Sequence, residues 1–252
     1  MLTIVLAYFN YKDVEATLSS LENTDIIILE NPSKYSEQMS NVVKKFPEVI
    51  HHFIAKENND MEIAHYFLNN YSSLLEKYKY IAITEGDVIL EKGALEEAIF
   101  LLDKYAHVGN VSIDLSLENL TIPPLPPSAV NWVPRGSDCG DHIFGDTGFQ
   151  FILFRKEHLF DFISEINNKT ISAPIALGIN DFTGISDTNL GIFNRRKKTP
   201  WIRTKYHKLL HIGWEHYKDP NDEYWLLKTE SLNTGKIRVN VDLNNIKLIK
   251  LF

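Results

Sequence analysis

Two carboxylates stand directly after an apolar run in the first half of the chain. The segment Tyr80–Leu90 reads Y-I-A-I-T-E-G-D-V-I-L, in which Glu85 and Asp87 flank Gly86. The run Tyr80–Ile83 is typical of a buried strand, and open α/β sheets bind ligands at the carboxyl ends of their strands. Mg²⁺ is commonly held by one or two carboxylates together with phosphate oxygens. The segment therefore predicts a site for a divalent cation and a diphosphate.

Composition and charge limit the kinds of partner that the chain is expected to bind. Its 252 residues are 44% hydrophobic and 23% charged, as expected for one α/β domain with or without a small appendage. The net charge of −7 disfavours a nucleic-acid-binding surface, and an anionic substrate would need a local cation. The single cysteine excludes an intrachain disulfide, and the apolar run at Leu2–Tyr8 is too short for a signal peptide or a membrane span. We therefore expect a cytoplasmic protein that binds no nucleic acid.

Strand-like and helix-like patterns alternate along the chain and must position these carboxylates. The alternation predicts βαβ units and a mostly parallel sheet flanked by helices, an α/β fold. The expected strands are Leu2–Tyr8, Asp25–Leu29, Val49–Ala55, Tyr80–Ile83, Val108–Ile113, Phe149–Phe154 and Lys208–Ile212. The expected helices are Lys12–Leu21, a short one around Val42–Phe46, Met61–Leu75, Gly93–Tyr105, Lys156–Ile166 and Ile185–Phe193.

A loop region separates the two halves of this pattern. Thr121–Trp132 contains four prolines, which exclude a regular helix or a central strand. Loops next to a rigid sheet often carry specificity, and aromatic side chains commonly line ligand sites. We therefore expect this loop, with Trp132, to contact a substrate.

Four stretches, supported by two weaker matches, resemble GT-A-fold glycosyltransferases, close to the family 2-like enzymes that build bacterial polysaccharides from nucleotide sugars. I-T-E-G-D-V-I-L-E-K-G-A-L resembles the D-x-D metal motif followed by P-G-A-L, with Asp87 as the strict match and Glu85 in place of the first Asp. I-S-D-T-N-L-G-I-F-N-R-R resembles the E-D-x-D-L-x-x-R segment, whose acidic residue is the catalytic base, here Asp187. K-L-L-H-I-G-W resembles a late strand ending in a metal-binding His, here His211.

The remaining matches concern the donor pocket. I-V-L-A-Y-F-N stands where the family lines the nucleotide base, and I-I-I-L-E-N-P-S stands where it reaches uracil or ribose. K-E-N-N-D-M-E-I-A-H is similar to a segment that shapes the donor pocket. The resemblance thus implies donor contacts from Ala7, Tyr8, Phe9, Asn10, Glu30, Asn31, Asn58, Glu85 and Gly86.

The resemblance implies an activity and a division of the chain. It implies a GT-A domain over residues 1–217, with a nucleotide-sugar-binding half at 1–115, an acceptor half at 116–217, and a C-terminal helix and tail at 218–252. The resemblance also implies an activity. The protein would bind Mn²⁺ or Mg²⁺ through Asp87, Glu85 and His211, and it would move a sugar from a nucleoside-diphosphate donor, expected to be UDP-linked, to a glycan or lipid-linked acceptor. Asp187 would act as the base of an inverting reaction, with Asp181 and Asp146 as substitutes, and the expected pathway is bacterial surface polysaccharide synthesis.

Other interpretations stay open. Glu85 and Asp87 could form a polar turn, Asp187 could cap a helix, and His211 could be a core histidine. The departures at Pro32, Glu85 and Ser186 are compatible with a degenerate domain that binds nucleotide or glycan without turnover. A sugar nucleotidyltransferase needs a glycine-rich phosphate loop after its first strand, where this chain has A-Y-F-N-Y-K-D.

The C-terminal I-K-L-I-K-L-F suggests an edge strand or a contact between copies of the chain, so a homo-oligomer stays open. Docking of this tail on a membrane surface, at the inner face of the plasma membrane, is the alternative.

Overall fold

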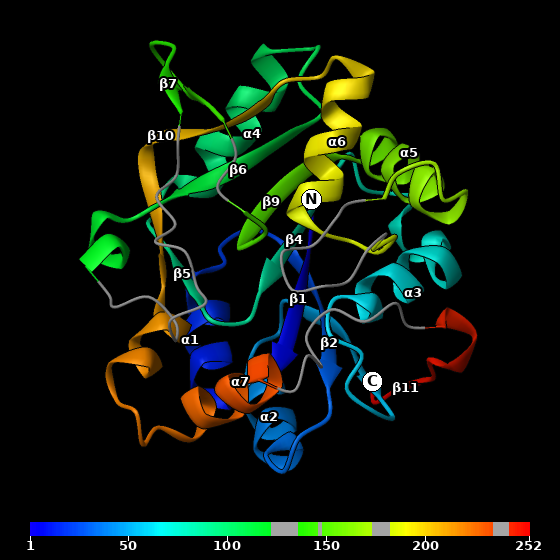
Figure 1. Ribbon diagram of the computed structural model, residues 1–252, viewed down its shortest axis with the longest axis vertical. Helices are drawn as coiled ribbons and strands as arrows, with labels where there is room; N and C mark the ends of the chain where they lie inside the picture. Colours follow the sequence, from blue (N-terminus) through cyan, green and yellow to red (C-terminus); the bar gives the residue numbers. More distant parts are fainter. Residues whose placement is uncertain (122–135, 146–147, 173–181, 234–241) are drawn as a thin grey trace.

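One large sheet with helices on both faces organises the chain (Figure 1). The computed structural model describes residues 1–121, 136–145, 148–172, 182–233 and 242–252. The strands are β1 (Leu2–Tyr8), β2 (Asp25–Asn31), β3 (Val49–Ala55), β4 (Tyr80–Glu85), β5 (Val88–Leu90), β6 (Asn110–Leu115), β7 (Ser137–Asp138), β8 (Ile143–Phe144), β9 (Phe151–Arg155), β10 (Trp201–His211) and β11 (Leu248–Lys250).

The long strands of the sheet share one direction. The strand order is β11-β3-β2-β1-β4-β9-β6-β10-β8-β7, with β5 paired to β10. Strands β3, β2, β1 and β4 are parallel neighbours. Strand β9 is antiparallel to both β4 and β6, so β6 and its parallel neighbour β10 run in the direction of β4. The α/β fold with a mostly parallel central sheet, predicted from the alternating pattern, is therefore confirmed.

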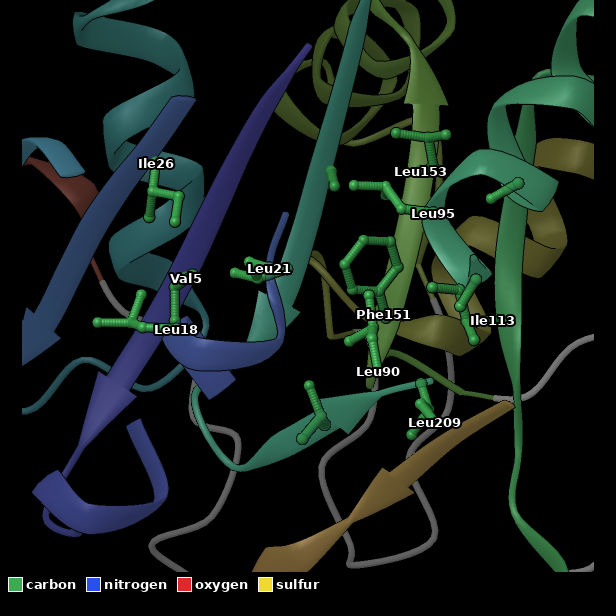
Figure 2. Close-up of a cluster of buried hydrophobic side chains, with 14 of the residues drawn as sticks. Val5, Leu18, Leu21, Ile26, Leu90, Leu95, Ile113, Phe151, Leu153 and Leu209 are labelled. Carbon is green, nitrogen blue, oxygen red and sulfur yellow. The ribbon is translucent and has the colours of Figure 1, made fainter. Parts of the chain in front are cut away.

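Helices cover both faces because the strands are apolar on both sides. The helices are α1 (Tyr11–Ser20), α2 (Ser36–Val43), α3 (Glu62–Asn70), α4 (Ala94–Lys104), α5 (Lys156–Asn167), α6 (Asp187–Lys197) and α7 (Glu223–Asn233), with short 3₁₀ turns η1 (Ser72–Leu75), η2 (Leu117–Thr121), η3 (Ile212–Lys218) and η4 (Leu243–Asn245). On β1, Val5 belongs to the core cluster that includes residues of α1, α2 and α4, whereas Ile4 belongs to the cluster that includes residues of α3, α5 and α6. This alternation builds two cores, and Figure 2 shows Val5, Leu18 and Phe151 in the first.

Strand β10 begins earlier than predicted, at Trp201 rather than Lys208, because tertiary contacts neutralise its charges. Arg203 Nε lies 3.1 Å from Asp114 Oδ1, and Lys208 Nζ donates to Asp114 Oδ2 at 2.6 Å. Where the pairing of β10 with β6 shifts register, the Glu97 carboxylate accepts hydrogen bonds from the backbone N–H groups of residues 205, 206 and 207. No local pattern in this polar stretch could have revealed these partners.

The C-terminal tail adds an edge strand. Leu248–Lys250 pairs antiparallel with β3, which confirms the edge-strand interpretation of I-K-L-I-K-L-F. Within the described ranges, no helix is long and apolar enough to cross a membrane.

Candidate metal and donor site

The three predicted metal ligands converge at one edge of the sheet. Glu85 ends β4, Asp87 precedes β5, and His211 ends β10. Antiparallel pairing of β5 with β10 places Val88 opposite His211, which brings the histidine beside Asp87. His211 Nε2 lies 2.9 Å from Glu85 Oε2 and 3.9 Å from Asp87 Oδ1, and the three donor atoms all lie within 4.8 Å of one another.

Backbone and side-chain contacts hold this cluster in place. The Asp87 carbonyl accepts hydrogen bonds from the backbone N–H groups of Ile212 (2.8 Å) and Gly213 (3.3 Å). The buried Asn119 amide donates to the His211 carbonyl at 3.0 Å and accepts from the His211 N–H at 2.9 Å. The His211 ring stacks on Trp214 with a centroid distance of 4.7 Å. Such supporting contacts fix ligand orientation, and the cluster is therefore preorganised.

Glycine between the two carboxylates is required by close packing. A Cβ atom at Gly86 would lie 2.9 Å from both the Leu6 carbonyl oxygen on β1 and Val14 Cγ2 on α1. A Cβ at Gly213 would lie 2.0 Å from Asp87 Oδ2. The E-G-D spacing thus lets the turn approach β1 closely enough to present both carboxylates on the same side.

Gly86→Ala is expected to lower the free energy of unfolding by about 1–3 kcal/mol and to weaken Mn²⁺ binding, because the methyl group overpacks the turn. Chemical denaturation and a Mn²⁺ titration measure the two effects. Gly191→Ala in α6 is the control, since its Cβ would meet only Arg195 Nη1 at 3.6 Å, an ordinary contact. Unchanged stability in Gly86→Ala would contradict the packing argument.

A cavity of about 470 Å³ opens in front of the cluster. This volume suits a drug-sized or nucleotide-sized ligand. Its wall carries six carboxylates, whereas no lysine or arginine of the described residues lines it. The carboxylates are Asp13, Asp60, Glu62, Glu85, Asp87 and Asp187. Among the described lining residues, no lysine or arginine could offset the charge of an anionic ligand, which favours entry together with a cation.

Most predicted donor contacts lie on this wall. Asn31 also shapes it, since its amide donates to the Asp60 carbonyl at 3.1 Å and its oxygen accepts from the Asn59 N–H at 2.9 Å. The predicted residues that line the cavity are Ala7, Tyr8, Asn10, Asn31, Asn58, Glu85 and Gly86. The sheet thus brings seven of the nine predicted donor contacts together.

Glu30 and Phe9 lie elsewhere. Successive side chains of a strand point to opposite faces, and Glu30 is turned away from the cavity side on which its neighbour Asn31 lies. It is 1% exposed and hydrogen-bonds His52 Nε2 at 2.7 Å. Phe9, in the left-handed region at φ 59°, packs its ring edge-on against Tyr35 at 5.1 Å. This arrangement gives no support to the expected donor contact of either side chain.

Asp187 occupies the first position of α6 on the cavity wall. The helix cap is Ser186, whose Oγ accepts a hydrogen bond from the Asn189 N–H at 3.1 Å. Asp187 Oδ1 accepts from the Thr188 N–H at 2.7 Å. The interpretation of Asp187 as the cap is therefore wrong, and Asp187 is instead a first-turn residue that lines the cavity. The substitutes Asp146 and Asp181, and the loop with Trp132, lie outside the described residues.

Sequence reasoning missed several residues of the wall. Asp13 on α1 lines the cavity and lies 3.0 Å from His216 Nε2, a partner 203 residues away. Glu62 and Tyr224 also line it. No spacing pattern links these positions, since they come from separate elements that only the folded chain brings together.

Sequence comparison finds relatives of this chain among uncharacterized viral proteins. No family model matches the chain. It is 28% identical over 246 residues to an uncharacterized protein of Acanthamoeba polyphaga mimivirus (L137), covering 91% of this chain and 31% of that protein. A second uncharacterized mimivirus protein (L142) is 26% identical over 219 residues, covering 82% and 42%. The chain thus spans less than half the length of these curated relatives.

The similar solved structures are glycosyltransferases of the GT-A fold. S. aureus TarS 1–349 has a TM-score of 0.52 at 11% identity, covering 96% of this chain and 67% of that one. Mannosyltransferase PcManGT from Pyrobaculum calidifontis, in complex with GDP-Man and Mn²⁺, has a TM-score of 0.50 at 13% identity, covering 91% and 63%. GalNAc-T7 with UDP, GalNAc and Mn²⁺ has a TM-score of 0.52 at 10% identity, covering 84% and 43%. The chain therefore has a GT-A fold.

Proposed function

We propose that the protein is a metal-dependent glycosyltransferase that moves a sugar from a nucleoside-diphosphate donor to a hydroxyl acceptor. One observation carries the proposal. Glu85, Asp87 and His211 converge at the carboxyl edge of the sheet, on the wall of a cavity where no described lysine or arginine could neutralise a diphosphate. Mn²⁺ complexes of GDP-Man and of UDP with GalNAc in two proteins of similar fold support the same chemistry.

The ligand set fits a divalent cation. Two carboxylates and one imidazole suit Mn²⁺, and the carboxylates alone also suit Mg²⁺. When bound at Glu85, Asp87 and His211, the cation would supply Lewis-acid stabilisation of the negative charge that develops on the leaving diphosphate. Glu85 and Asp87 would hold the cation, and the Asn119 side chain keeps the His211 backbone in place beside them.

Asp187 is the proposed proton acceptor. As the acceptor oxygen forms a bond to the anomeric carbon, the bond from that carbon to the diphosphate breaks and the hydroxyl proton passes to the Asp187 carboxylate. The hydrogen bond from the Thr188 N–H orients the carboxylate at the start of α6. One base acting opposite the leaving group inverts the anomeric centre, which is the expected stereochemistry.

We propose the donor and the acceptor as chemical classes. Tyr8, Asn10, Asn31 and Asn58 line the cavity where the resemblance expects the nucleoside, and UDP is the first nucleotide to test. The proposed acceptor is a glycan or a lipid-linked sugar. Surface polysaccharide synthesis is proposed on the resemblance alone, since the two mimivirus relatives L137 and L142 are uncharacterized.

A second candidate is a domain that binds nucleotide or glycan without turnover. Its support is the contact of His211 Nε2 with Glu85 Oε2 at 2.9 Å, because these ligands can satisfy each other without an ion. A sugar nucleotidyltransferase is disfavoured, since Tyr8, Phe9 and Asn10 replace the glycine-rich loop that such an enzyme needs.

Thermal stabilisation tests the binding part of the proposal. We expect one of UDP, GDP, CMP and dTDP to raise the melting temperature only when Mn²⁺ is present, because a ligand of the folded state stabilises it by mass action. Mn²⁺ alone, and the nucleotide with a chelator, are the controls. If no nucleotide raises the melting temperature at saturating Mn²⁺, the proposal is wrong and glycan binding becomes the better account.

A further inference from the structure

Residues 212–227, called here the wall segment, form one side of the cavity. They follow the proposed metal ligand His211 and comprise η3 and the start of α7. Trp214, Tyr217 and Tyr224 of this segment line the cavity. The position of the segment therefore decides the shape of the site.

His216 ties the wall segment to α1. Its Nε2 lies 3.0 Å from Asp13 Oδ2 and 2.7 Å from the side-chain amide nitrogen of Asn10. Its Nδ1 lies 2.8 Å from Asp222 Oδ2, within the segment itself. The His216 ring also packs edge-on against Tyr224 at 5.5 Å. Both ring nitrogens thus face carboxylates, and only the doubly protonated ring can donate to both, whereas a neutral ring could accept from the Asn10 amide at Nε2.

The two carboxylates favour the charged ring. The hydrogen bond with Asp13, and to a lesser degree that with Asp222, raises the pKa of His216 from 6.5 to about 9. Charge-assisted hydrogen bonds are stronger than neutral ones. Glu223 of the segment also pairs with Lys34 and accepts from the Tyr35 hydroxyl at 2.9 Å, but these residues lie just before α2 and the contacts are exposed, where ion pairs contribute little. His216 thus ties the wall segment to α1 by a charge-assisted hydrogen bond.

We propose that His216 is a positioning residue, which as an imidazolium fixes the wall segment against α1 and so holds the aromatic side of the cavity in place for the nucleotide. This inference rests on the proposed function for its ligand. His216 itself does not line the cavity, so its effect on the ligand passes through the wall segment and through the lining residues Asn10 and Asp13 that it contacts.

His216→Gln tests the tether in two measurements. Amide hydrogen exchange of the ligand-free variant should be faster over residues 212–227 and unchanged over β1 to β4. Nucleotide affinity at saturating Mn²⁺ should fall about tenfold, the effect of losing one charge-assisted hydrogen bond. Affinity for Mn²⁺ alone should stay within about twofold, because the ligands Glu85 and Asp87 are untouched.

The control is His142→Gln, which removes another histidine–aspartate pair, with Asp141 at 2.8 Å, far from the cavity wall. Unchanged exchange over residues 212–227 in His216→Gln would overturn the tether. Faster exchange with unchanged nucleotide affinity would overturn the positioning role and leave a structural one. If the wild type binds no nucleotide, the proposed function fails, whereas the ligand-free exchange still decides the tether.

The pH dependence gives an independent readout. The groups that face His216 are Asp13, Asp222, Asn10 and Tyr224, and burial raises the pKa of Tyr224 well above its usual value, so it stays neutral. Because the folded pKa of His216 is raised, its contribution to stability is complete below pH 6.5 and is lost as the pH rises through about 9. The melting-temperature difference between wild type and His216→Gln should therefore shrink from pH 7 to pH 10. A constant difference would contradict a charged tether.

Discussion

Asp87→Asn is expected to lower the affinity for Mn²⁺, and with it the Mn²⁺-dependent affinity for nucleotide, by about 100-fold or more, because even indirect disturbance of a metal ligand costs 10–100-fold. Asp87 is the residue whose position is fixed from two directions, by the N–H groups of Ile212 and Gly213 and by the turn at Gly86. Calorimetric titration of Mn²⁺, followed by nucleotide, measures both affinities.

Asp60→Asn is the matched control for this loss of charge. Asp60 also lines the cavity but lies outside the cluster of Glu85, Asp87 and His211. Its backbone is left-handed at φ 49°, a conformation that Asn tolerates well. If Asp60→Asn and Asp87→Asn reduced Mn²⁺ affinity equally, the effect would be general electrostatics and the assigned metal site would be wrong.

Asp187→Asn should reduce the turnover number by about 10²–10⁴-fold while donor affinity stays close to that of the wild type, as expected for loss of a general base. The amide keeps an oxygen that can accept from the Thr188 N–H, so the start of α6 should remain intact. Transfer rates at saturating donor, together with donor affinity, separate the chemical step from binding.

Ser186→Ala provides the comparison for helix α6. Removing the cap should cost about 1 kcal/mol of stability without removing the proton acceptor. A turnover number of Asp187→Asn within twofold of wild type, or a loss equal to that in Ser186→Ala, would assign the base to another residue.

Much of the sheet could be predicted because a buried strand is recognisable in the sequence as a run of apolar residues. Strands β1 and β3 have the predicted bounds, since both are largely apolar runs with buried side chains, and alternate side chains of β1 serve the two cores. The metal cluster could be predicted in part for the same reason. Glu85 and Asp87 follow a buried strand directly, so the end of β4 fixes their place at the ligand-binding edge.

The parts that escaped prediction depend on contacts distant in sequence. Asn119 supports His211, and Asp13 meets His216, but neither pair shares a spacing rule. Glu30, by contrast, was predicted to contact the donor but does not line the cavity. A carboxylate at a strand end suggested ligand binding, whereas the face on which it lies directs it to His52. A linear pattern gives strand ends reliably, but the choice between two faces depends on the neighbouring strand.

Donor turnover tests the central claim most directly. The protein would be incubated with UDP-, GDP- and dTDP-sugars, with and without Mn²⁺, and release of nucleoside diphosphate would be measured by chromatography for wild type and Asp87→Asn. We predict Mn²⁺-dependent release from one donor class, even slowly to water as acceptor, and none from Asp87→Asn. Nucleotide binding without release from any of these donors, under conditions in which the wild type is folded and loaded with Mn²⁺, would contradict the transferase account and support a domain that binds without turnover.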